Sequence, residues 1–295
     1  MAPITAGRLL GARIALHPLF LAALALYAAC GLFLEAVILF SAVFLHEFGH
    51  VAAARRAGID VAEVELLPFG GVAKAGDLLG YDPLVEIAVA LAGPLVNGAL
   101  ILGAVTAGLV WEIPPQAARA FFEANAVIGG FNLLPALPLD GGRVLRALLA
   151  RRVGFRRATR AAVGIGRAVS LSMLTAGIVL VASGRASASF VIVPAFVFLA
   201  AGREEDLAAL LFMRYLVRRR SDLRRERCRP CRHLAAGPDT PLKEVVWEFV
   251  PQCYHMVWVV TPEGGPAALA SEMEVLDAVL ERGMHERIGR VARPF

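Results

Sequence analysis

The chain of 295 residues is too apolar for an ordinary soluble protein: 58% of its residues are hydrophobic and 19% are charged. Soluble globular proteins are usually about 45–50% apolar, so this composition predicts a protein of the lipid bilayer. The net charge of +5 does not indicate nucleic-acid binding, because the arginines lie beside apolar runs, as in segments that face anionic lipid. The cysteines are too sparse for a disulfide framework.

The first two thirds of the chain consist mainly of apolar runs near the length that crosses a bilayer, about 20 residues. They predict six membrane-spanning helices at Ile14–Cys30, Leu32–Ala54, Pro83–Trp111, Ala117–Leu134, Ala161–Ser183 and Ala188–Gly202. No small-residue cleavage site follows the first run, so we expect it to be retained.

Arginines cluster beside one set of span ends. They precede the first span, follow the second, separate the fourth from the fifth, and form a basic run after the sixth at Arg214–Arg232. The positive-inside rule then places both termini in the cytoplasm of a multi-pass protein of the cell membrane.

Val61–Gly76 is too polar and glycine-rich for a helix in lipid. Its alternating pattern predicts a short strand, followed by a turn at Phe69-Gly70-Gly71. Backbone of this kind at membrane depth must be shielded by protein or line a wet cavity.

The sequence therefore predicts an all-α polytopic membrane domain, with a short membrane-level β element, followed by a small α+β cytoplasmic domain. The expected boundaries are 1–202 for the membrane domain, 203–232 for a basic helical linker and 233–295 for the tail. Within the tail we expect strands at His233–Ala236, Tyr254–Val260 and Pro266–Ala270, and helices at Pro241–Phe249 and Glu272–Arg282.

The sequence His46-Glu47-Phe48-Gly49-His50 lies inside the second apolar run. On a helix, positions i and i+4 share one face, so both imidazoles can reach one metal ion while Glu47 reaches its water. The motif also fits two histidines and a glutamate at a wet helix end. Ionisable side chains within a lipid-buried helix are costly, however, and are functional by default. We therefore interpret the motif as a metal site.

A catalytic zinc site needs a third protein ligand at the same membrane depth, and an open position for water. Asp140 is the preferred candidate, because it follows the proline-broken end of the fourth span in Asn132-Leu-Leu-Pro-Ala-Leu-Pro-Leu-Asp140-Gly141-Gly142. We expect the two glycines to allow a tight turn directly after the carboxylate.

Other readings of these carboxylates stay open. Glu63 and Glu65 are alternative third ligands, because some metalloproteases use a downstream glutamate. Their alternation with apolar residues better suits a strand with one solvated face. Asp140 could instead be an ordinary helix-cap carboxylate before the two glycines, although its apolar, proline-broken surroundings weaken that reading.

HEFGH on a membrane span, followed by NLLPALPLDGG, resembles the site-2 protease family of intramembrane zinc metalloproteases. The resemblance covers about residues 10–200 and includes Ala92-Gly93-Pro94 and Asn97 in the third span. The six-span layout with a cytoplasmic tail is most similar to the sporulation branch, which processes a membrane-associated pro-sigma factor.

This resemblance implies one zinc ion per chain, held by His46, His50 and Asp140, with Glu47 as the catalytic base. Asn132 would orient the substrate or the developing oxyanion. The implied reaction is hydrolysis of a peptide bond in a membrane-associated protein, such as a pro-sigma factor or a membrane-tethered regulator, near the cytoplasmic face. We expect the substrate to unwind and pair with the strand near Val64. An inhibitory membrane partner would also fit this branch.

The tail resembles a single CBS motif in its order of strands and helices. Such motifs work in pairs, so we expect a homo-oligomer joined through the tail. The family often binds adenine nucleotide through a carboxylate after the last strand, but Ser271-Glu-Met-Glu274 replaces the usual Thr-x-x-Asp. A nucleotide site and a dimerising domain without ligand both stay open.

Two weaker signals favour other sites or functions. Cys228 and Cys231, with Cys253 and His255, could form a structural zinc site, but a lone CxxC favours reduced cytosolic thiols.

Buried polar residues and broken helices also suit a membrane transporter or metal carrier, although the two halves share no repeated broken helix. A catalytically dead sensor is the third reading, and the complete set of site residues argues against it.

Overall fold

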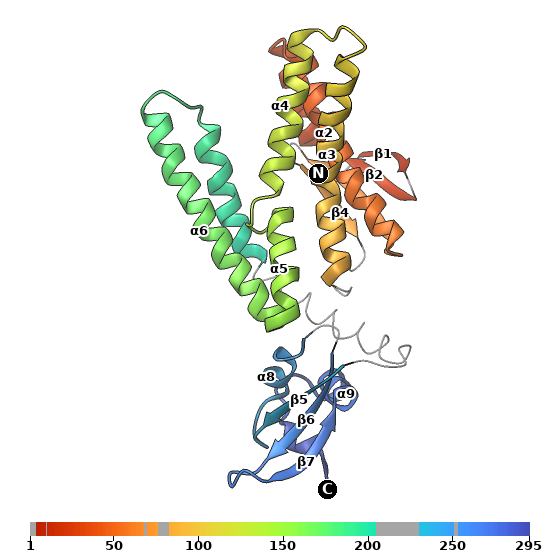
Figure 1. Cartoon of the computed structure of the whole chain (residues 1–295), viewed down its shortest axis with the longest axis vertical. Helices are drawn as coiled ribbons and strands as arrows, with labels where there is room; N and C mark the ends of the chain where they lie inside the picture. Colours follow the sequence, from red (N-terminus) through yellow and green to blue (C-terminus); the bar gives the residue numbers. More distant parts are fainter. Residues whose placement is uncertain (1–3, 10, 68–69, 76–82, 205–229, 251–252) are drawn as a thin grey trace.

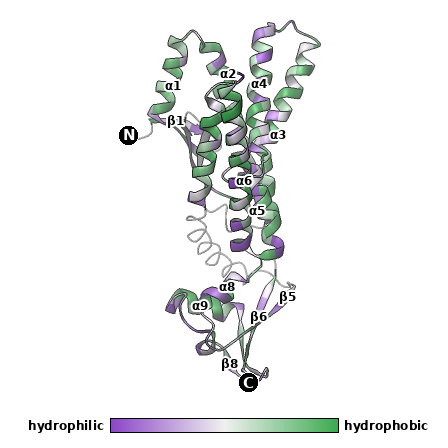
Figure 2. Ribbon diagram, turned by 90° about the vertical axis from the view of Figure 1, so that its left-hand side faces the viewer, coloured by the Kyte–Doolittle hydropathy of each residue, from purple (hydrophilic) through white to green (hydrophobic). Residues whose placement is uncertain are grey.

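The computed structural model describes residues 4–9, 11–67, 70–75, 83–204, 230–250 and 253–295, and a helical part and a smaller tail with a sheet follow one another along its long axis (Figure 1). Hydrophobic residues dominate the helices of the first part (Figure 2). In the described ranges, three helices are long and apolar enough to cross a membrane: α2 (Phe33–Arg56), α3 (Pro83–Gly108) and α6 (Phe155–Ala182). The chain is therefore a helical membrane domain followed by a mixed α/β sheet region.

The first predicted span is shorter in the structure. Helix α1 covers only Pro18–Ala29, which is 12 residues, or about 18 Å at 1.5 Å per residue. The preceding residues form strand β2 (Ala12–Leu16) instead. His17 separates the two elements, because its Nδ1 accepts a hydrogen bond from the backbone N–H of Leu19 and so caps the helix. Pro18 suits the first turn, where its missing N–H is not needed.

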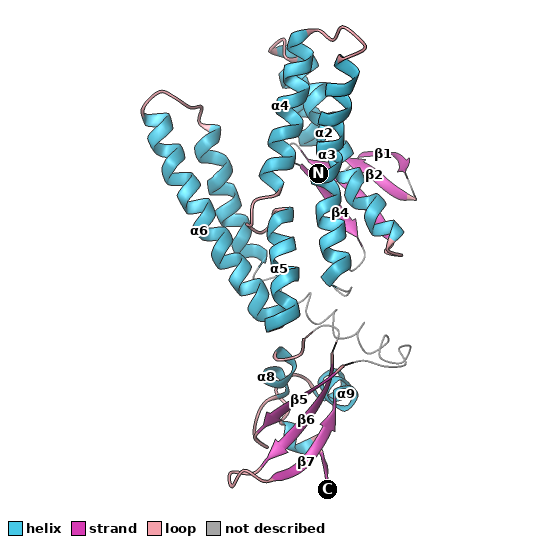
Figure 3. Ribbon diagram, in the orientation of Figure 1, coloured by secondary structure: helices cyan, strands magenta, loops and turns pink. Residues whose placement is uncertain are grey.

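A four-stranded sheet lies beside the helices, with the order β1-β2-β3-β4 (Figure 3). Its other strands are β1 (Ile4–Leu9), β3 (Val61–Leu67) and β4 (Gly70–Ala75). Strands β2 and β3 are parallel, whereas the outer pairs are antiparallel. The predicted strand after Val61 is confirmed, but Gly70 and Gly71 begin β4 rather than form a turn, and Phe69 lies outside the described residues. The sequence did not predict the two N-terminal strands.

The sheet packs against α2 and α3 through buried apolar side chains. Ala12, Val61 and Val64 come from the sheet, Val51 and Ala54 from α2, and Val89 from α3. Burial of these side chains holds the strands next to the helix that carries the HExxH motif.

Two further helices connect the long ones. Helix α4 (Pro115–Asn132) agrees with the fourth predicted span, and α5 (Asp140–Val153) is an additional helix that the sequence analysis did not predict. Residues 189–204 are also helical and run beside α6 (Figure 1). Asp140 is thus the first residue of a helix, and Gly141 and Gly142 are helical too, so the expected tight turn after the carboxylate is wrong.

The tail contains the predicted strands and helices in the predicted order. They are β5 (Cys231–Ala236), α8 (Leu242–Trp247), β6 (Tyr254–Val260), β7 (Pro266–Ser271), α9 (Glu272–Arg282), a 3-10 turn (Ile288–Arg290) and β8 (Arg293–Pro294). The sheet order is β5-β6-β7-β8, with β5 parallel to β6. The predicted helical linker falls almost wholly on residues 205–229, which lie outside the described residues.

The corner between α5 and α6 docks on the tail. Phe155, the first residue of α6, is only 6% exposed and belongs to the same hydrophobic cluster as Leu242 and Val246 of α8. Gly154 forms the corner at a φ of 81°, a conformation that glycine adopts readily. The guanidinium of Arg156 lies 3.4 Å from the centre of the Trp247 ring. The membrane domain and the tail are therefore packed together at this corner.

Replacing Phe155 by alanine should loosen this contact. Removing a buried phenylalanine side chain costs roughly 3–5 kcal/mol, so we expect faster amide hydrogen exchange in α8 of Phe155→Ala than in the wild type. Phe190→Ala is the matched control, because Phe190 is 54% exposed on the membrane domain. Equal exchange in the wild type and both variants would show that the corner does not hold the tail.

Candidate metal centre

The two histidines of the motif project from one face of α2 toward α3. Gly49 lies between them in sequence and faces α3, where an added Cβ would lie 2.8 Å from the carbonyl oxygen of Ala92. A larger residue would push the helices apart. Gly93 lies opposite the imidazoles, and an added Cβ there would collide with the Nε2 atoms of both His46 and His50. The two glycines thus leave space in front of both imidazoles.

Asp140 reaches the same space from the first turn of α5. Its position depends on Gly141 and Gly142, because a Cβ on Gly141 would collide with the carbonyl oxygens of Leu133 and Leu134, and one on Gly142 with the backbone of Leu137. Leu137 is fully buried against Ala162 and Val163 of α6. The glycines therefore let the helix begin directly on the preceding loop.

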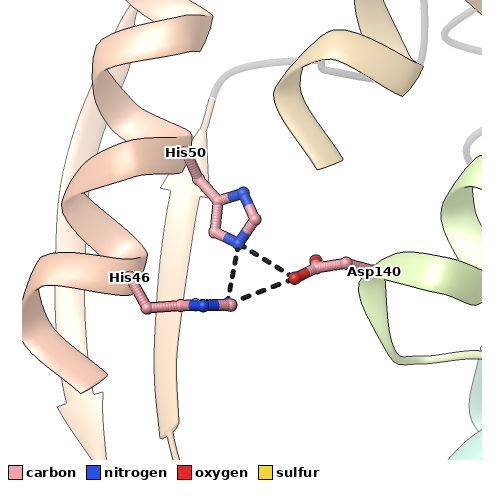
Figure 4. A group of neighbouring side chains, drawn as sticks. All are labelled: His46, His50 and Asp140. Carbon is pink, nitrogen blue, oxygen red and sulfur yellow. Dashed lines mark hydrogen bonds and ion pairs between the residues drawn. The ribbon is translucent and has the colours of Figure 1, made fainter. Parts of the chain in front are cut away.

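Three ligand atoms meet in this space (Figure 4). Nε2 of His46 and Nε2 of His50 are 3.1 Å apart, and the Asp140 Oδ2 lies 3.2 Å from the first and 3.1 Å from the second. Zinc in a tetrahedral site lies about 2.0–2.1 Å from its donors, which separates neighbouring donors by about 3.3–3.4 Å. The distances between the three donor atoms, which form a triangle, are thus close to those in a tetrahedral zinc site.

The hydrogen bonds of the other ring nitrogens explain why these atoms need a cation. His50 Nδ1 lies 2.8 Å from the carbonyl oxygen of Val89, which can only accept, so Nδ1 must carry the proton. His46 Nδ1 lies 2.6 Å from Oδ1 of Asn97 and is protonated in the same way. In the neutral imidazoles both Nε2 atoms are then acceptors, and they face a carboxylate oxygen. Three acceptors this close repel one another unless a cation lies between them.

The chemistry of these donors also fits zinc. Two imidazole nitrogens and one carboxylate form a ligand set of catalytic zinc sites that keep an open position. Backbone and side-chain acceptors behind the imidazoles fix the rings, as is usual around bound metal ions. His46, His50 and Asp140 therefore form a zinc site.

Glu47 lies beside the zinc ligands. It is close enough to His46, His50 and Asp140 for electrostatic interaction. Its side chain lines a small pocket between α2 and the sheet, whose other walls are the apolar residues Ala12, Ile14, Phe44, Phe48, Val51 and Val64. A carboxylate is thus held at the edge of the donor triangle in largely apolar surroundings.

The structure distinguishes the alternatives for the third ligand. Among the described residues, His46, His50 and Asp140 are the one group of at least three histidine, cysteine, aspartate or glutamate side chains suited to a metal ion. Glu63 and Glu65 lie on β3 and do not belong to it. Asn132 ends α4 and donates from Nδ2 to the Ile128 carbonyl oxygen at 3.0 Å.

Among the described residues, Cys231, Cys253 and His255 do not form a metal-binding group. This histidine is fully buried, and its Nδ1 lies 2.9 Å from Oε2 of Glu272. Its Nε2 accepts from the backbone N–H of Val250, so both ring nitrogens are engaged. Cys231 is exposed, and Cys228 lies outside the described residues.

Sequence analysis missed part of the centre. Gly93 was noted only as part of a resemblance, and Arg143 was not predicted. Arg143 lies three positions after Asp140 on α5 and interacts electrostatically with it and with Glu47. The spacing of Asp140 and Arg143 would have been the signal, since i and i+3 share a helix face, but α5 itself was not predicted.

Comparisons with known proteins agree with this geometry. Residues 34–124 and 114–173 match peptidase family M50. A zinc metalloprotease of Methanocaldococcus jannaschii is 34% identical over 145 residues, which are 48% of this chain and 42% of that protein. Stage IV sporulation protein FB of Bacillus subtilis is 29% identical over 269 residues, which are 90% of this chain and 91% of that protein.

The fold also resembles a solved structure. The site-2 protease from Methanocaldococcus jannaschii matches with a TM-score of 0.55 and 29% identity, over 69% of this chain and 95% of that chain. The chain spans less than half the length of the archaeal metalloprotease that it matches in sequence, but nearly all of the B. subtilis sporulation protein.

A methyl group at Gly93 should disturb the zinc site. Because an added Cβ collides with both Nε2 atoms, we expect Gly93→Ala to bind zinc on the order of 10–100 times more weakly, the usual range when the support of metal ligands is disturbed. Gly98→Ala on the same helix is the control, since nothing lies within 4 Å of an added Cβ there. Zinc content after dialysis against a chelator measures the effect. Equal zinc retention in both variants would contradict this account of the space.

Proposed function

This chain belongs to peptidase family M50, the site-2 proteases, and we propose that it is an intramembrane zinc metalloprotease. Its substrate would be a membrane-associated protein that is cut near the cytoplasmic face. The observation that carries the proposal is the triangle of His46, His50 and Asp140 with Glu47 beside it, built on an apolar helix long enough to cross a bilayer.

The zinc ion and the residues around it would have different roles in peptide hydrolysis. Zinc, when bound in such a site, acidifies a water molecule and polarises the carbonyl group of the peptide bond to be cut. We assign Glu47 the role of general base, which takes the proton of that water and returns it to the leaving amine. Its place within the HExxH turn and its apolar pocket support this role.

Asn132 would position the substrate. Its amide nitrogen donates one hydrogen to the Ile128 carbonyl oxygen, which orients the side chain at the end of α4. The nitrogen carries a second hydrogen, which could be donated to a developing oxyanion, and Oδ1 could accept from a substrate N–H. This assignment of Asn132 as a catalytic residue stays a prediction.

The membrane-level sheet changes the expected route of the substrate. Strand β3, which contains Val64, is paired on both sides, by β2 and β4, so the expected addition of a substrate strand to β3 is wrong. In the described part of the sheet, the outer edges belong to β1 and β4. An unwound substrate segment would add to one of these edges through backbone hydrogen bonds.

We further propose six membrane crossings with both termini in the cytoplasm. The three long apolar helices support the core of this arrangement. The remaining crossings would be made by α1, by α4 and by residues 189–204. The arginine-rich segments supply the orientation. The proposed domains remain 1–202 for the protease, 203–232 for the linker and 233–295 for the tail.

The tail would act as a CBS-like pairing domain that joins copies of the chain into a homo-oligomer. Trp258 and Phe295 support this role, because their ring centres lie 5.6 Å apart and Phe295 is 73% exposed. Adenine nucleotide binding is less supported. The Glu274 carboxylate already accepts from the Ser271 hydroxyl and pairs with Arg293, so a nucleotide would have to compete with both.

The sporulation protein of B. subtilis is similar over 90% of this chain. A pro-sigma factor or another membrane-tethered regulator is therefore the substrate class that we propose, together with an inhibitory membrane partner.

Glu47→Gln should separate chemistry from metal binding. The amide cannot take the proton of the water, so we expect cleavage of a membrane-tethered substrate in proteoliposomes to fall by about 10²–10⁴-fold, while about one zinc per chain is retained. Glu35→Gln is the matched control, because Glu35 lies near the start of the same helix, where it binds Gln116. It should keep both zinc and cleavage.

The same measurements distinguish the rival functions. A transporter would move zinc into the vesicles without cutting the substrate, and a dead sensor would do neither. Full cleavage by the Glu47→Gln variant would exclude Glu47 as the base.

A further inference from the structure

A chain of buried amides leads away from the zinc site across two helices. Asn97 on α3 is 1% exposed and Asn125 on α4 is fully buried. The Asn97 Nδ2 donates to the Asn125 Oδ1 at 2.9 Å, and the Asn125 Nδ2 donates to the carbonyl oxygen of Phe121 at 2.9 Å. Among the described hydrogen bonds, Asn125 is thus connected to His46 through Asn97.

The direction of these hydrogen bonds follows from the far end of the chain of amides. The Phe121 carbonyl oxygen can only accept, so the amide nitrogen of Asn125 must face it, and the Asn125 oxygen then faces Asn97. That oxygen can only accept as well, so Asn97 turns its nitrogen toward it and its own oxygen toward His46. At 2.6 Å from this oxygen, the His46 Nδ1 must carry the proton. Each amide thus has one permitted orientation.

Both histidines carry their proton on Nδ1, but a different kind of acceptor holds it there in each case. His50 Nδ1 donates directly to the backbone carbonyl oxygen of Val89. A backbone carbonyl group cannot rotate to present a donor instead. His46 depends on a side-chain amide, and an isolated amide could rotate and present its nitrogen. In that orientation Nδ1 would accept, and the proton would move to Nε2, the atom that faces Asp140 and His50. A second amide is therefore needed to fix the first.

We propose that Asn125 is a positioning residue for the zinc site, which holds Asn97 in the orientation that keeps the proton of His46 on Nδ1. The Nε2 lone pair of His46 is then available to the metal ion. This inference rests on the proposed function for its zinc ion, but it concerns metal binding and the state of one imidazole rather than cleavage. The placement of two amides inside apolar helices, where polar groups are costly, is explained by this role.

Two substitutions of Asn125 test the proposal. Asn125→Leu keeps roughly the same shape but removes the acceptor for Asn97, so we expect the full-length protein to bind zinc on the order of 10–100 times more weakly. In Asn125→Asp, the protonated carboxyl group can accept from Asn97 and donate to the Phe121 carbonyl, so zinc affinity should return to within a few fold of the wild type. Competition with a zinc chelator measures both affinities.

Ser170→Ala is the control for general damage to the membrane domain. Ser170 is 1% exposed, and its Oγ has no hydrogen-bond partner within the part of the chain that the structure describes. This variant should bind zinc like the wild type. Melting temperatures of the metal-free proteins show whether any loss of zinc affinity merely follows a loss of stability.

The protonated nitrogen of His46 provides a second readout, which is measured in the wild-type protein itself. In ¹⁵N-histidine-labelled, metal-free wild-type protein at about pH 8.5, where an ordinary imidazole is neutral, the His46 signal should report a proton on Nδ1. A His46→Gln variant assigns the signal. In Asn125→Leu the signal should shift toward the form protonated on Nε2.

The results separate this inference from the proposed protease function. A proton on Nε2 of His46 in the wild type, or unchanged zinc affinity in Asn125→Leu, would overturn the role of Asn125 whether or not the protein cuts a substrate. A wild-type protein that binds zinc and shows the expected histidine signals, yet cleaves nothing, would instead refute the protease activity and leave the role of Asn125 supported.

Discussion

The repulsion among three closely spaced acceptors is the constraint on which the membrane domain depends. The Nε2 atoms of His46 and His50 and the Oδ2 of Asp140 lie within 3.2 Å of one another, and each offers an electron pair. A cation bound between them makes this arrangement favourable in apolar surroundings, where uncompensated polar atoms are most costly. Helices α2 and α5 must therefore be held so that their donors meet, and α3 packs beside both of them.

Small residues and buried amides meet this requirement in different ways. Gly49 and Gly93 let α2 and α3 approach each other, whereas Gly141 and Gly142 let α5 begin on its own preceding loop. In a membrane, close approach of this kind replaces much of the hydrophobic driving force between helices. The amide of Asn97 has a different effect, because its hydrogen bond determines which nitrogen of the His46 imidazole carries the proton.

Helix α5 links the zinc site to the tail. Asp140 is at one end of this helix, and the corner that carries Phe155 into the tail's hydrophobic cluster is at the other. Between them, the buried Arg146 donates from Nε to Glu86 of α3 at 3.1 Å and lies over the Phe155 ring. A single helix, fixed at its middle by a buried ion pair, thus carries a metal ligand and borders the contact with the tail.

The sequence alone determined the features that depend on local order along the chain. The spacing of His46 and His50 placed both on one helix face, apolar length identified α2, α3 and α6, and alternation identified β3. Only the tertiary structure decided the features that join distant segments. It selected Asp140 over Glu63 and Glu65, paired β2 with β3, and brought Asn125 to Asn97. These contacts depend on how helices pack across more than twenty residues of intervening chain, and neither periodicity nor residue type encodes such distances.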